Sequence, residues 1–318
     1  MPGTERLASA MRNATLILGG GGFIGKRLSA ALRRSGQSVA VLGHGLEDAV
    51  AADFVQRRGS VEDAGLLREL LEASACVVYL ASVTTPSASA REPGLEVTGN
   101  LLPLARFMEI AQSVAPRKLV FISSAGAVYG DQADGVTENI ALRPRSFYGA
   151  GKAAAEAMLH AFTVNSGWST VVLRPTNVYG PGQLPIKGFA IVPTIFRHLR
   201  DRSVFEIWGD GSVVRDYLFV DDLCSLVARS IASNARTYRV YNAGSGTAVS
   251  ILELVRRCEQ AAGMRLETAL RPARAVDVPR AVPNIDAVAN DYDWHAPTAL
   301  DAGLSQTWQW LRTVFPPQ

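Results

Sequence analysis

The feature that most constrains this 318-residue chain is a run of glycines near its N-terminus. A short apolar segment, Thr15–Leu18, leads directly into Gly19-Gly20-Gly21-Gly22-Phe23-Ile24-Gly25, and a helical pattern follows over Lys26–Ser35. Glycines at the first, fourth and seventh positions permit a tight turn, close approach of the backbone to a pyrophosphate, and close packing of helix on strand. A helix N-terminus adds unpaired N–H groups and the positive end of a dipole. The sequence therefore predicts dinucleotide binding at the first strand–helix junction.

The rest of the first half alternates short apolar runs with longer helical patterns. Continuous apolar runs are typical of strands buried on both faces of a parallel sheet, and here they are Ser38–Leu42, Cys76–Leu80, Lys118–Ile122 and Ser169–Leu173. The helical patterns between them are Ala64–Ala73, Leu101–Ser113 and Gly149–Asn165. This alternation predicts an α/β fold of the Rossmann type, with a doubly wound parallel sheet.

The regular alternation of strand and helix patterns ends after Thr176, and Gly, Pro and aromatic residues are frequent in Asn177–Gly188. We therefore expect a dinucleotide-binding domain over residues 13–176 and a smaller C-terminal α/β substrate-binding domain, mainly over residues 177–318, with some segments crossing back to the first. Ligands of open α/β sheets bind in the crevice beyond the carboxyl ends of the strands. We expect the active site where the two parts meet.

Composition narrows the functional classes. The net charge is only +3, and no basic run with interleaved aromatic residues indicates a nucleic-acid partner. No apolar stretch approaches the roughly 20 residues that span a membrane, and residues 1–12 lack the long apolar core of a signal peptide. The three cysteines, Cys76, Cys224 and Cys258, form no CxxC or Cys/His cluster. Cys76 and Cys224 sit in apolar runs, which predicts buried thiols, and the sparse, odd count predicts no metal site and a cytoplasmic location.

A second chemical motif is Tyr148-Gly149-Ala150-Gly151-Lys152, at the start of a predicted helix. Residues four apart share one helix face, so Lys152 stands beside Tyr148. A phenol with a pKa near ~10 is a poor base at neutral pH, but a neighbouring ammonium and a positive nicotinamide ring favour the phenolate. The pair then suits proton exchange with a sugar hydroxyl.

A third motif is Ile122-Ser123-Ser124-Ala125-Gly126-Ala127-Val128-Tyr129-Gly130, which follows the predicted strand Lys118–Ile122. Hydroxyl groups at the carboxyl end of such a strand point into the cleft, where they suit binding of a substrate oxygen. Two further segments are rich in Gly, Pro and charge, namely Arg174–Gly182 (RPTNVYGPG) and Gly209–Tyr217 (GDGSVVRDY).

Together these motifs resemble those of the extended short-chain dehydrogenase/reductases, and are most similar to the UDP-galactose 4-epimerase-like branch of sugar-nucleotide enzymes. The resemblance runs from Thr15 to about Leu311. It implies that Tyr148 is the acid/base on the sugar 4-hydroxyl and that Lys152 lowers its pKa and holds the nicotinamide ribose. It implies NAD as cofactor, bound by Gly19, Gly22, Phe23, Ile24, Gly25, His44, Ser60, Val61, Leu80, Ala81, Ser82, Asn100, Tyr148, Lys152 and Pro175.

The same resemblance implies a UDP-sugar substrate and a homodimer. Asn177 and Arg215 match residues at the substrate diphosphate, and Arg274 with Asp277 matches a late pair at the diphosphate and ribose. Trp208, with Ile207 before it, matches the position beside the nucleotide base. Guanidinium groups suit a diphosphate because they match phosphate oxygens bidentately. Relatives commonly dimerise through the helix that bears YxxxK and the helix before it.

Two departures from the family pattern bear on the site. Counting back from Val128, the catalytic Ser/Thr position falls on Ala125, so Ser124 or Ser123 must supply the hydroxyl, and we choose Ser124. The second strand ends in Gly43-His44, where NAD-preferring members carry an acidic residue, and the acidic position that contacts adenine is Ser60. The sequence thus favours NAD by resemblance while leaving NADP open.

The reaction that fits best is 4-epimerisation of a UDP-hexose or UDP-N-acetylhexosamine through transient oxidation at C4 by bound NAD. Dehydratases carry an Asp–Glu pair where this chain has Gly126 and Ala127, and decarboxylases use an acidic residue there. Ala281 falls at the position that limits bulk at the sugar C2 substituent, so an acetamido group has room. An NAD(P)H-dependent 4-keto-sugar reductase is the enzymatic alternative. A non-catalytic NAD(P)-binding regulatory protein is the alternative of another class.

Overall fold

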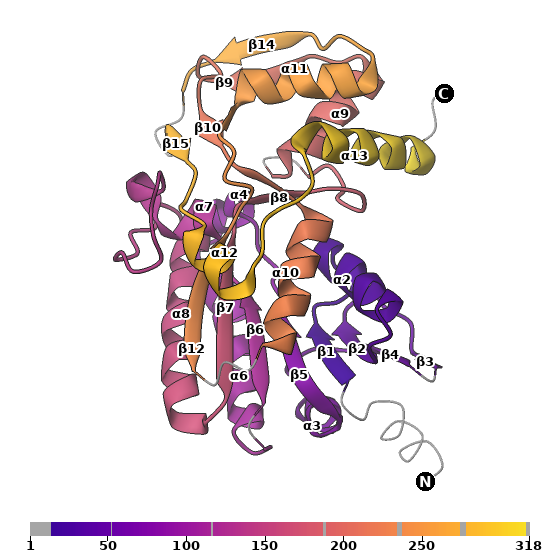
Figure 1. Cartoon of the computed structure of the whole chain (residues 1–318), viewed down its shortest axis with the longest axis vertical. Coiled ribbons are helices and arrows are strands. Elements are labelled where there is room, and N and C mark those ends of the chain that lie inside the picture. The colour runs from indigo at the N-terminus through magenta and orange to yellow at the C-terminus, as the bar shows by residue number, and fades with distance from the viewer. Residues whose placement is uncertain are drawn as a thin grey trace.

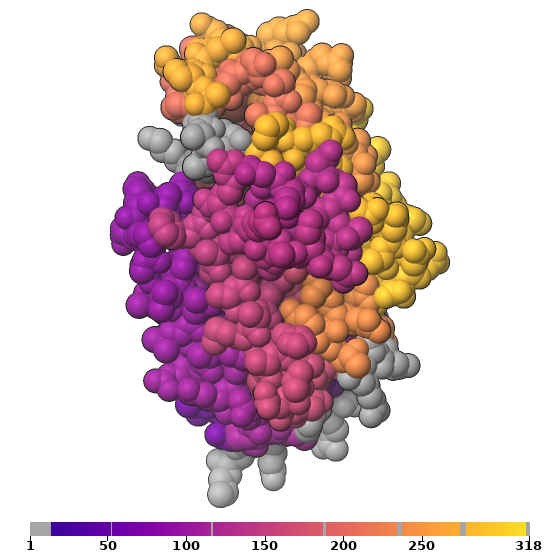
Figure 2. Space-filling view, turned by 90° about the vertical axis from the view of Figure 1, so that its left-hand side faces the viewer, coloured from indigo at the N-terminus to yellow at the C-terminus, as the bar shows by residue number. Residues whose placement is uncertain are grey.

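The computed structural model describes residues 14–51, 53–115, 117–186, 189–233, 237–273 and 278–315. A central sheet with helices on both faces forms the larger part of the molecule, and a smaller part sits over one end of it (Figure 1). Figure 2 shows the same division on one face, with indigo to magenta chain below and orange chain above.

The central sheet has eight strands in the order β12-β7-β6-β5-β1-β2-β4-β3. All neighbours are parallel except β3 and β4, so the predicted doubly wound Rossmann-type sheet is confirmed. The chain winds outward from β1 to β4, returns beside β1 as β5, and continues the other way, which puts the switch point between β1 and β5. The strands are β1 (Ala14–Leu18), β2 (Val39–Gly43), β3 (Ala49–Ala51), β4 (Phe54–Arg58), β5 (Ser74–Tyr79), β6 (Lys118–Ile122), β7 (Ser169–Pro175) and β12 (Tyr238–Ala243).

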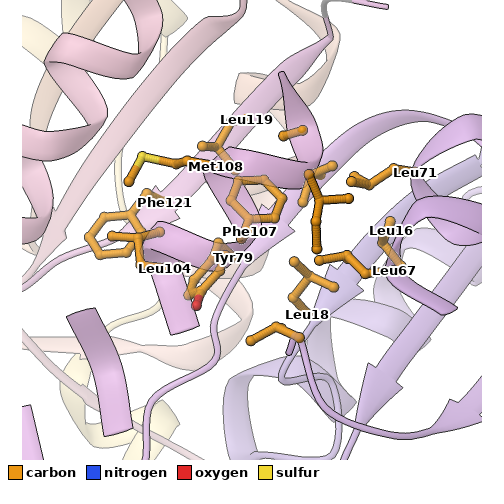
Figure 3. Packing of buried hydrophobic residues seen from close by; sticks show 14 of the residues in the cluster. Leu16, Leu18, Leu67, Leu71, Tyr79, Leu104, Phe107, Met108, Leu119 and Phe121 are labelled. Carbon is orange, nitrogen blue, oxygen red and sulfur yellow. The ribbon is translucent and has the colours of Figure 1, made fainter. Parts of the chain in front are cut away.

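Each face of the sheet has its own apolar core. The alternation of side chains along β1 sends Leu16 and Leu18 into one core and Ile17 into the other. On the first face Tyr79 packs edge-on against Phe107 at 5.4 Å between ring centroids (Figure 3), and burial of Phe107 alone stabilises the fold by about 1.5–3 kcal/mol. The helices of this face are α3 (Ala64–Ala73), α6 (Leu102–Ala111) and α8 (Phe147–Ser166); those of the other face are α2 (Phe23–Arg34), α10 (Val220–Ala232) and α12 (Asp286–Tyr292).

The smaller part has a third core between helices and short strands. Its elements are β8 (Asn177–Tyr179), α9 (Ile191–Asp201), β9 (Phe205–Trp208), β10 (Val214–Arg215), β11 (Tyr217–Phe219), β13 (Val249–Ser250), α11 (Ile251–Ala262), β14 (Thr268–Arg271), β15 (Arg280–Ala281) and α13 (Leu300–Val314). The chain leaves this part as α10 and β12 and completes the large sheet before it returns. Among the described residues, no helix is long and apolar enough to cross a membrane.

The larger part also has short helical turns. They are α4 (Pro86–Arg91), α5 (Gly94–Glu96), the π-helical η1 (Val97–Leu101), α7 (Ala125–Val128) and the 3-10 turn η2 (Gly130–Gln132). The prediction of buried thiols at Cys76 and Cys224 is confirmed, and Cys258 is also free and buried.

Candidate active site

The glycine-rich loop has the shape that a dinucleotide pyrophosphate needs. Gly19 has φ +83°, and a Cβ on it would lie 2.6 Å from the backbone nitrogen of Ala81, the loop that follows β5. A Cβ on Gly25 would lie 2.5 Å from Gly20 Cα, so this glycine lets α2 pack against the loop. Gly22 caps α2 without a side-chain hydrogen bond, which leaves the first-turn N–H groups to a ligand. These residues therefore fit a bound dinucleotide.

The other residues expected at the cofactor follow the carboxyl ends of neighbouring strands. His44 follows β2, Ser60 and Val61 follow β4, and Leu80, Ala81 and Ser82 follow β5. Pro175 ends β7, and its side chain is buried, as is that of Val61. His44 is exposed directly beyond β2, so the end of this strand carries no acidic side chain. The whole set lies along one edge of the sheet.

Tyr148 and Lys152 lie on one face of the first turns of α8. Ser146 caps this helix by accepting a hydrogen bond from Gly149 N at 3.1 Å. Lys152 Nζ is 5.8 Å from the centre of the Tyr148 ring and donates a hydrogen bond of 2.9 Å to the carbonyl oxygen of Ile122. The pair is thus fixed to the end of β6, as the predicted arrangement requires.

Burial controls the protonation of this pair in the protein itself. It raises the pKa of Tyr148 to about 12, and the nearby charge of Glu96 acts in the same direction. It lowers the pKa of Lys152 to about 8, against the opposing charges of Glu96 and Glu156. We expected Lys152 to favour the phenolate, but within the protein alone burial disfavours the charged forms of both groups. The charge of a bound nicotinamide must therefore contribute much of the stabilisation of a phenolate.

The two serines after β6 have different surroundings. Ser123 is buried and donates a hydrogen bond of 2.5 Å to Glu156 Oε1. Ser124 is half-buried, precedes α7 in an extended conformation, and makes no side-chain capping hydrogen bond. Ala125 is buried in an apolar cluster with Val128 and Ala281. Ser124 is therefore the more exposed of the two serines, and its hydroxyl makes no capping hydrogen bond.

Glu156 also belongs to a buried ion pair that holds the site together. Arg174 Nη2 lies 2.6 Å from Glu156 Oε2, and each side chain is only 5% exposed. Arg174 Nη1 donates to the hydroxyl of Tyr129, which donates to Asn242. This network joins α8, β7 and β12 behind the serines.

A buried carboxylate that sequence reasoning missed lies close to the pair. Glu96, at the end of α5, is 5% exposed and accepts hydrogen bonds from Ser89 Oγ and from Asn100 Nδ2, the latter at 2.8 Å. Asn100, which we expected near the nicotinamide, also binds Thr84 Oγ1 at 2.7 Å and lines a small cavity with Lys152. The one local signal for Glu96 is its position one helical turn before Asn100.

The residues expected at the substrate diphosphate are brought together by short strands. Asn177 Nδ2 donates to the carbonyl oxygen of Asp216 at 2.9 Å, next to Arg215. Arg215 pairs in register with Ala281 of β15, and its Nη1 donates to Val278 O at 2.7 Å. These contacts hold the Arg215 guanidinium group against the residues that precede β15.

The alternation along β9 separates the two residues expected near the nucleotide base. Trp208 is 43% exposed, whereas the Ile207 side chain is 2% exposed and packs into the third core, so Ile207 presents only its backbone to a ligand. Arg274 and Asp277 lie outside the described residues. Among the described residues, no three His, Cys, Asp or Glu side chains gather as they would around a metal ion.

Sequence comparison relates the chain to sugar-nucleotide enzymes. The sequence model of the NAD dependent epimerase/dehydratase family matches residues 15–244. A UDP-glucose 4-epimerase of Mycolicibacterium smegmatis is 30% identical over 310 residues, covering 94% of this chain and 98% of that protein. UDP-glucuronate 4-epimerase 5 of Arabidopsis thaliana is 26% identical, over 94% of this chain and 76% of the plant protein.

Solved structures show the same relationship. The UDP-glucose 4-epimerase of Thermotoga maritima, with UDP-glucose, matches with a TM-score of 0.87 at 26% identity, covering 95% of this chain and 99% of that one. MoeE5 in complex with UDP-glucuronic acid and NAD also matches with a TM-score of 0.87, at 30% identity over 95% of this chain and 100% of that one.

Proposed function

Because the chain belongs to the NAD dependent epimerase/dehydratase family, we propose that it is a nucleotide-sugar 4-epimerase that uses NAD and acts on a UDP-hexose or UDP-N-acetylhexosamine. The observation that carries this proposal is the fixed pair of Tyr148 and Lys152 beside a glycine loop shaped for a dinucleotide. Named relatives that are UDP-sugar 4-epimerases support the reaction class. We assign the dinucleotide to residues 13–176 and the sugar nucleotide mainly to residues 177–318.

In this proposal the redox step belongs to the cofactor, and the side chains of the protein bind the sugar and transfer the proton. When bound, NAD supplies a reversible redox step at the sugar C4. Tyr148 accepts the proton of the 4-hydroxyl and later returns it, and Ser124 donates a hydrogen bond to the same oxygen. Lys152, tied to Ile122 O, contributes the positive charge that stabilises the phenolate and binds the nicotinamide ribose.

Inversion at C4 requires the sugar to turn while the rest of the substrate stays bound. Asn177 and Arg215, with Arg274 and Asp277, hold the diphosphate and ribose in this proposal, and Trp208 lies against the base. A guanidinium held by Val278 O suits this role because guanidinium groups match phosphate oxygens bidentately. Binding energy then comes from the part of the substrate that does not react.

The chain departs from enzymes that eliminate water at this site. Gly126 and Ala127 occupy the first turn after Ser124, where an acid and a base for elimination would be needed. Neither residue exchanges a proton, which favours hydride chemistry at C4 alone over dehydration or decarboxylation.

We further propose that the enzyme works in the cytoplasm as a homodimer, in polysaccharide biosynthesis. Three free cysteines fit a reducing compartment. Helix α8 lies on the face seen in Figure 2, and its Val164 is 71% exposed, which fits a partner helix on that face.

The test begins with protein purified without added cofactor. Denaturation should release NAD⁺, identified by mass and absorbance, because an epimerase recycles its cofactor without releasing it. UDP-glucose and UDP-N-acetylglucosamine should each form the 4-epimer with no added reductant, and Tyr148→Phe should retain NAD⁺ without turnover. An empty protein that oxidises NADPH with a 4-keto nucleotide sugar would assign it as a reductase. No affinity for either dinucleotide would overturn the proposal.

A further inference from the structure

A carboxylate is an unexpected neighbour for a Tyr–Lys pair that must form a phenolate. Glu96 reaches α8 through Gly151, the residue directly before Lys152. A Cβ on Gly151 would lie 2.6 Å from Glu96 Oε2, so only a glycine allows the carboxylate to lie against this turn of the helix. The small cavity beside it is lined by Glu96 and Lys152 together with Asn100 and Ser82. Glu96 thus faces the turn that joins the two residues of the pair.

The surroundings of Glu96 keep its carboxylate in one place. Ser89 of α4 donates to Oε1 and Asn100 of η1 donates to Oε2. The two donors fix both oxygens of the carboxylate. Among the described residues, no lysine or arginine lies within ion-pair distance of Glu96, so its charge is not neutralised locally.

We propose that Glu96 is a positioning residue whose buried charge sets the pH range in which the Tyr148–Lys152 pair is active. This inference rests on the proposed function for the role of Tyr148. Glu96 touches neither side chain through a hydrogen bond. It acts across the turn at Gly151, through a medium in which charges are poorly screened.

Few other charges face this position. Tyr79 of β5 lines the same cavity, and Glu156 of α8 acts on Lys152 but has its own partner in Arg174. The other charged side chains on the elements that pack against α8 are exposed: Arg91 and Glu92 after α4, the mutually paired Arg106 and Glu109 of α6, and Arg239 of β12. Glu96 is therefore the main acidic influence common to Tyr148 and Lys152, and the pKa of each group responds to it.

The sign of the effect follows from coupled titration. With NAD bound, the active form of the pair carries one proton, as phenolate and ammonium, between a doubly protonated and a fully deprotonated form. A nearby negative charge favours each form that carries more protons, so Glu96 moves the upper and lower limits of the active range to higher pH together. Removing the charge moves both limits to lower pH.

The experiment compares Glu96→Gln with Glu96→Asp, Ser89→Ala and the exposed Glu92→Gln, all as NAD-bound protein. Glu96→Gln should shift both limbs of the pH profile of turnover to lower pH by about one unit, the usual size of a single nearby charge. Glu96→Asp should restore most of the original profile, and Glu92→Gln should match the unchanged protein. Ser89→Ala should shift the pH profile in the same direction as Glu96→Gln, but by a smaller amount. This variant still tests the proposal if Glu96→Gln folds poorly.

A second readout does not depend on turnover. The ionisation of Tyr148 is followed by tyrosinate absorbance, as the difference between each protein and the same protein with Tyr148→Phe. The midpoint should fall in Glu96→Gln by the same amount as the acid limb. Two results would show that Glu96 acts only by packing. One is a lower maximal rate with both limbs of the pH profile unshifted, and the other is an unchanged midpoint of Tyr148 ionisation. If no sugar nucleotide reacts at any pH, the proposed function fails, while the Tyr148 titration still decides the role of Glu96.

Discussion

Lys152 Nζ and the carbonyl oxygen of Ile122 are joined by a hydrogen bond of 2.9 Å, which ties the ammonium to the end of β6 just before the two serines. The carbonyl oxygen accepts this hydrogen bond in the protein itself, with no ligand involved. The position of the charge is therefore set by the fold, and the bound cofactor and sugar need not order it.

This lysine should limit activity at alkaline pH. Since burial lowers the pKa of Lys152, the required ammonium is lost at a lower pH than in an exposed lysine, and turnover should fall as the pH rises. Lys152→Arg should lower the maximal rate by roughly 10- to 100-fold but move the alkaline limb upward, because guanidinium stays protonated. Measured pH profiles of both proteins test this. An alkaline limb that is the same in both would assign it to another group.

The two serines should separate stability from catalysis. Ser123→Ala removes the donor to the buried Glu156 and should cost about 1–3 kcal/mol of unfolding free energy with little change in turnover of the folded protein. Ser124→Ala should leave stability unchanged and lower turnover by roughly 10- to 100-fold. Urea unfolding and initial rates measure the two effects. If Ser123→Ala alone lost turnover, Ser123 rather than Ser124 would be the serine that contacts the substrate.

The glycine loop offers a matched pair of substitutions. Gly19 and Gly36 have nearly the same backbone angle, with φ +83° and +79°, but a Cβ on Gly36 meets nothing within 4 Å. Both Gly→Ala variants carry the backbone strain, of order 1–3 kcal/mol. Only Gly19→Ala should also weaken NAD binding, by tenfold or more, because the methyl group would collide with the loop at Ala81. Calorimetric titration with NAD measures this, and equal affinities would show that the close approach at Gly19 is unimportant.

The sequence was most informative where a segment is buried on both faces. The predicted strands β1, β6 and β7 begin within one residue of their observed starts, because nothing but apolar side chains fits between two layers of helices. The prediction missed β4, whose second half, Gln56-Arg57-Arg58, is not buried. It also missed β12, an edge strand with the exposed Arg239. Strands at or next to the edge of a sheet need not be apolar, so no continuous apolar run marks β4 or β12.

Within the candidate site, motifs predicted the residues but not all of their contacts. The four-residue spacing placed Tyr148 and Lys152 on one face, since that depends on local helix geometry alone. The engagement of Ser123 by Glu156 depends on residues 33 positions apart, and no local pattern encodes it. Glu96 meets Gly151 only because α5 packs on α8. The long-range contacts of charged side chains are what sequence reasoning could not supply.

The buried pair of Arg174 and Glu156 should be important for stability when one partner is removed. Arg174→Met leaves a buried carboxylate without its cation and should cost about 3–5 kcal/mol of unfolding free energy. The double variant Arg174→Met/Glu156→Gln should recover part of that loss, because no isolated charge remains. Urea unfolding gives both values, and the exposed pair of Arg106 and Glu109 provides a control in Arg106→Met. Equal losses in the single and double variants would show that packing of the arginine, not its charge, matters.

Ala281 should set which sugars the site accepts. Its Cα pairs in register with that of Arg215, and its methyl group packs with Ala125 in the apolar cluster near the serines. A large side chain at 281 would have to displace this cluster or extend toward the sugar. Ala281→Tyr should therefore lower turnover of UDP-N-acetylglucosamine by tenfold or more relative to UDP-glucose, since a lost steric fit of this size is worth about 1–3 kcal/mol.

The control for this substitution lies on the same strand. Arg280 is exposed on the opposite face of β15, so Arg280→Tyr adds an aromatic ring there and should leave the ratio of the two rates unchanged. Overpacking in Ala281→Tyr is expected to cost about 1–3 kcal/mol of stability, so both variants are compared at temperatures where they remain folded. Since general damage slows both substrates alike, only the ratio reports on the space beside C2. Equal loss of both rates in Ala281→Tyr would place the C2 substituent away from this strand.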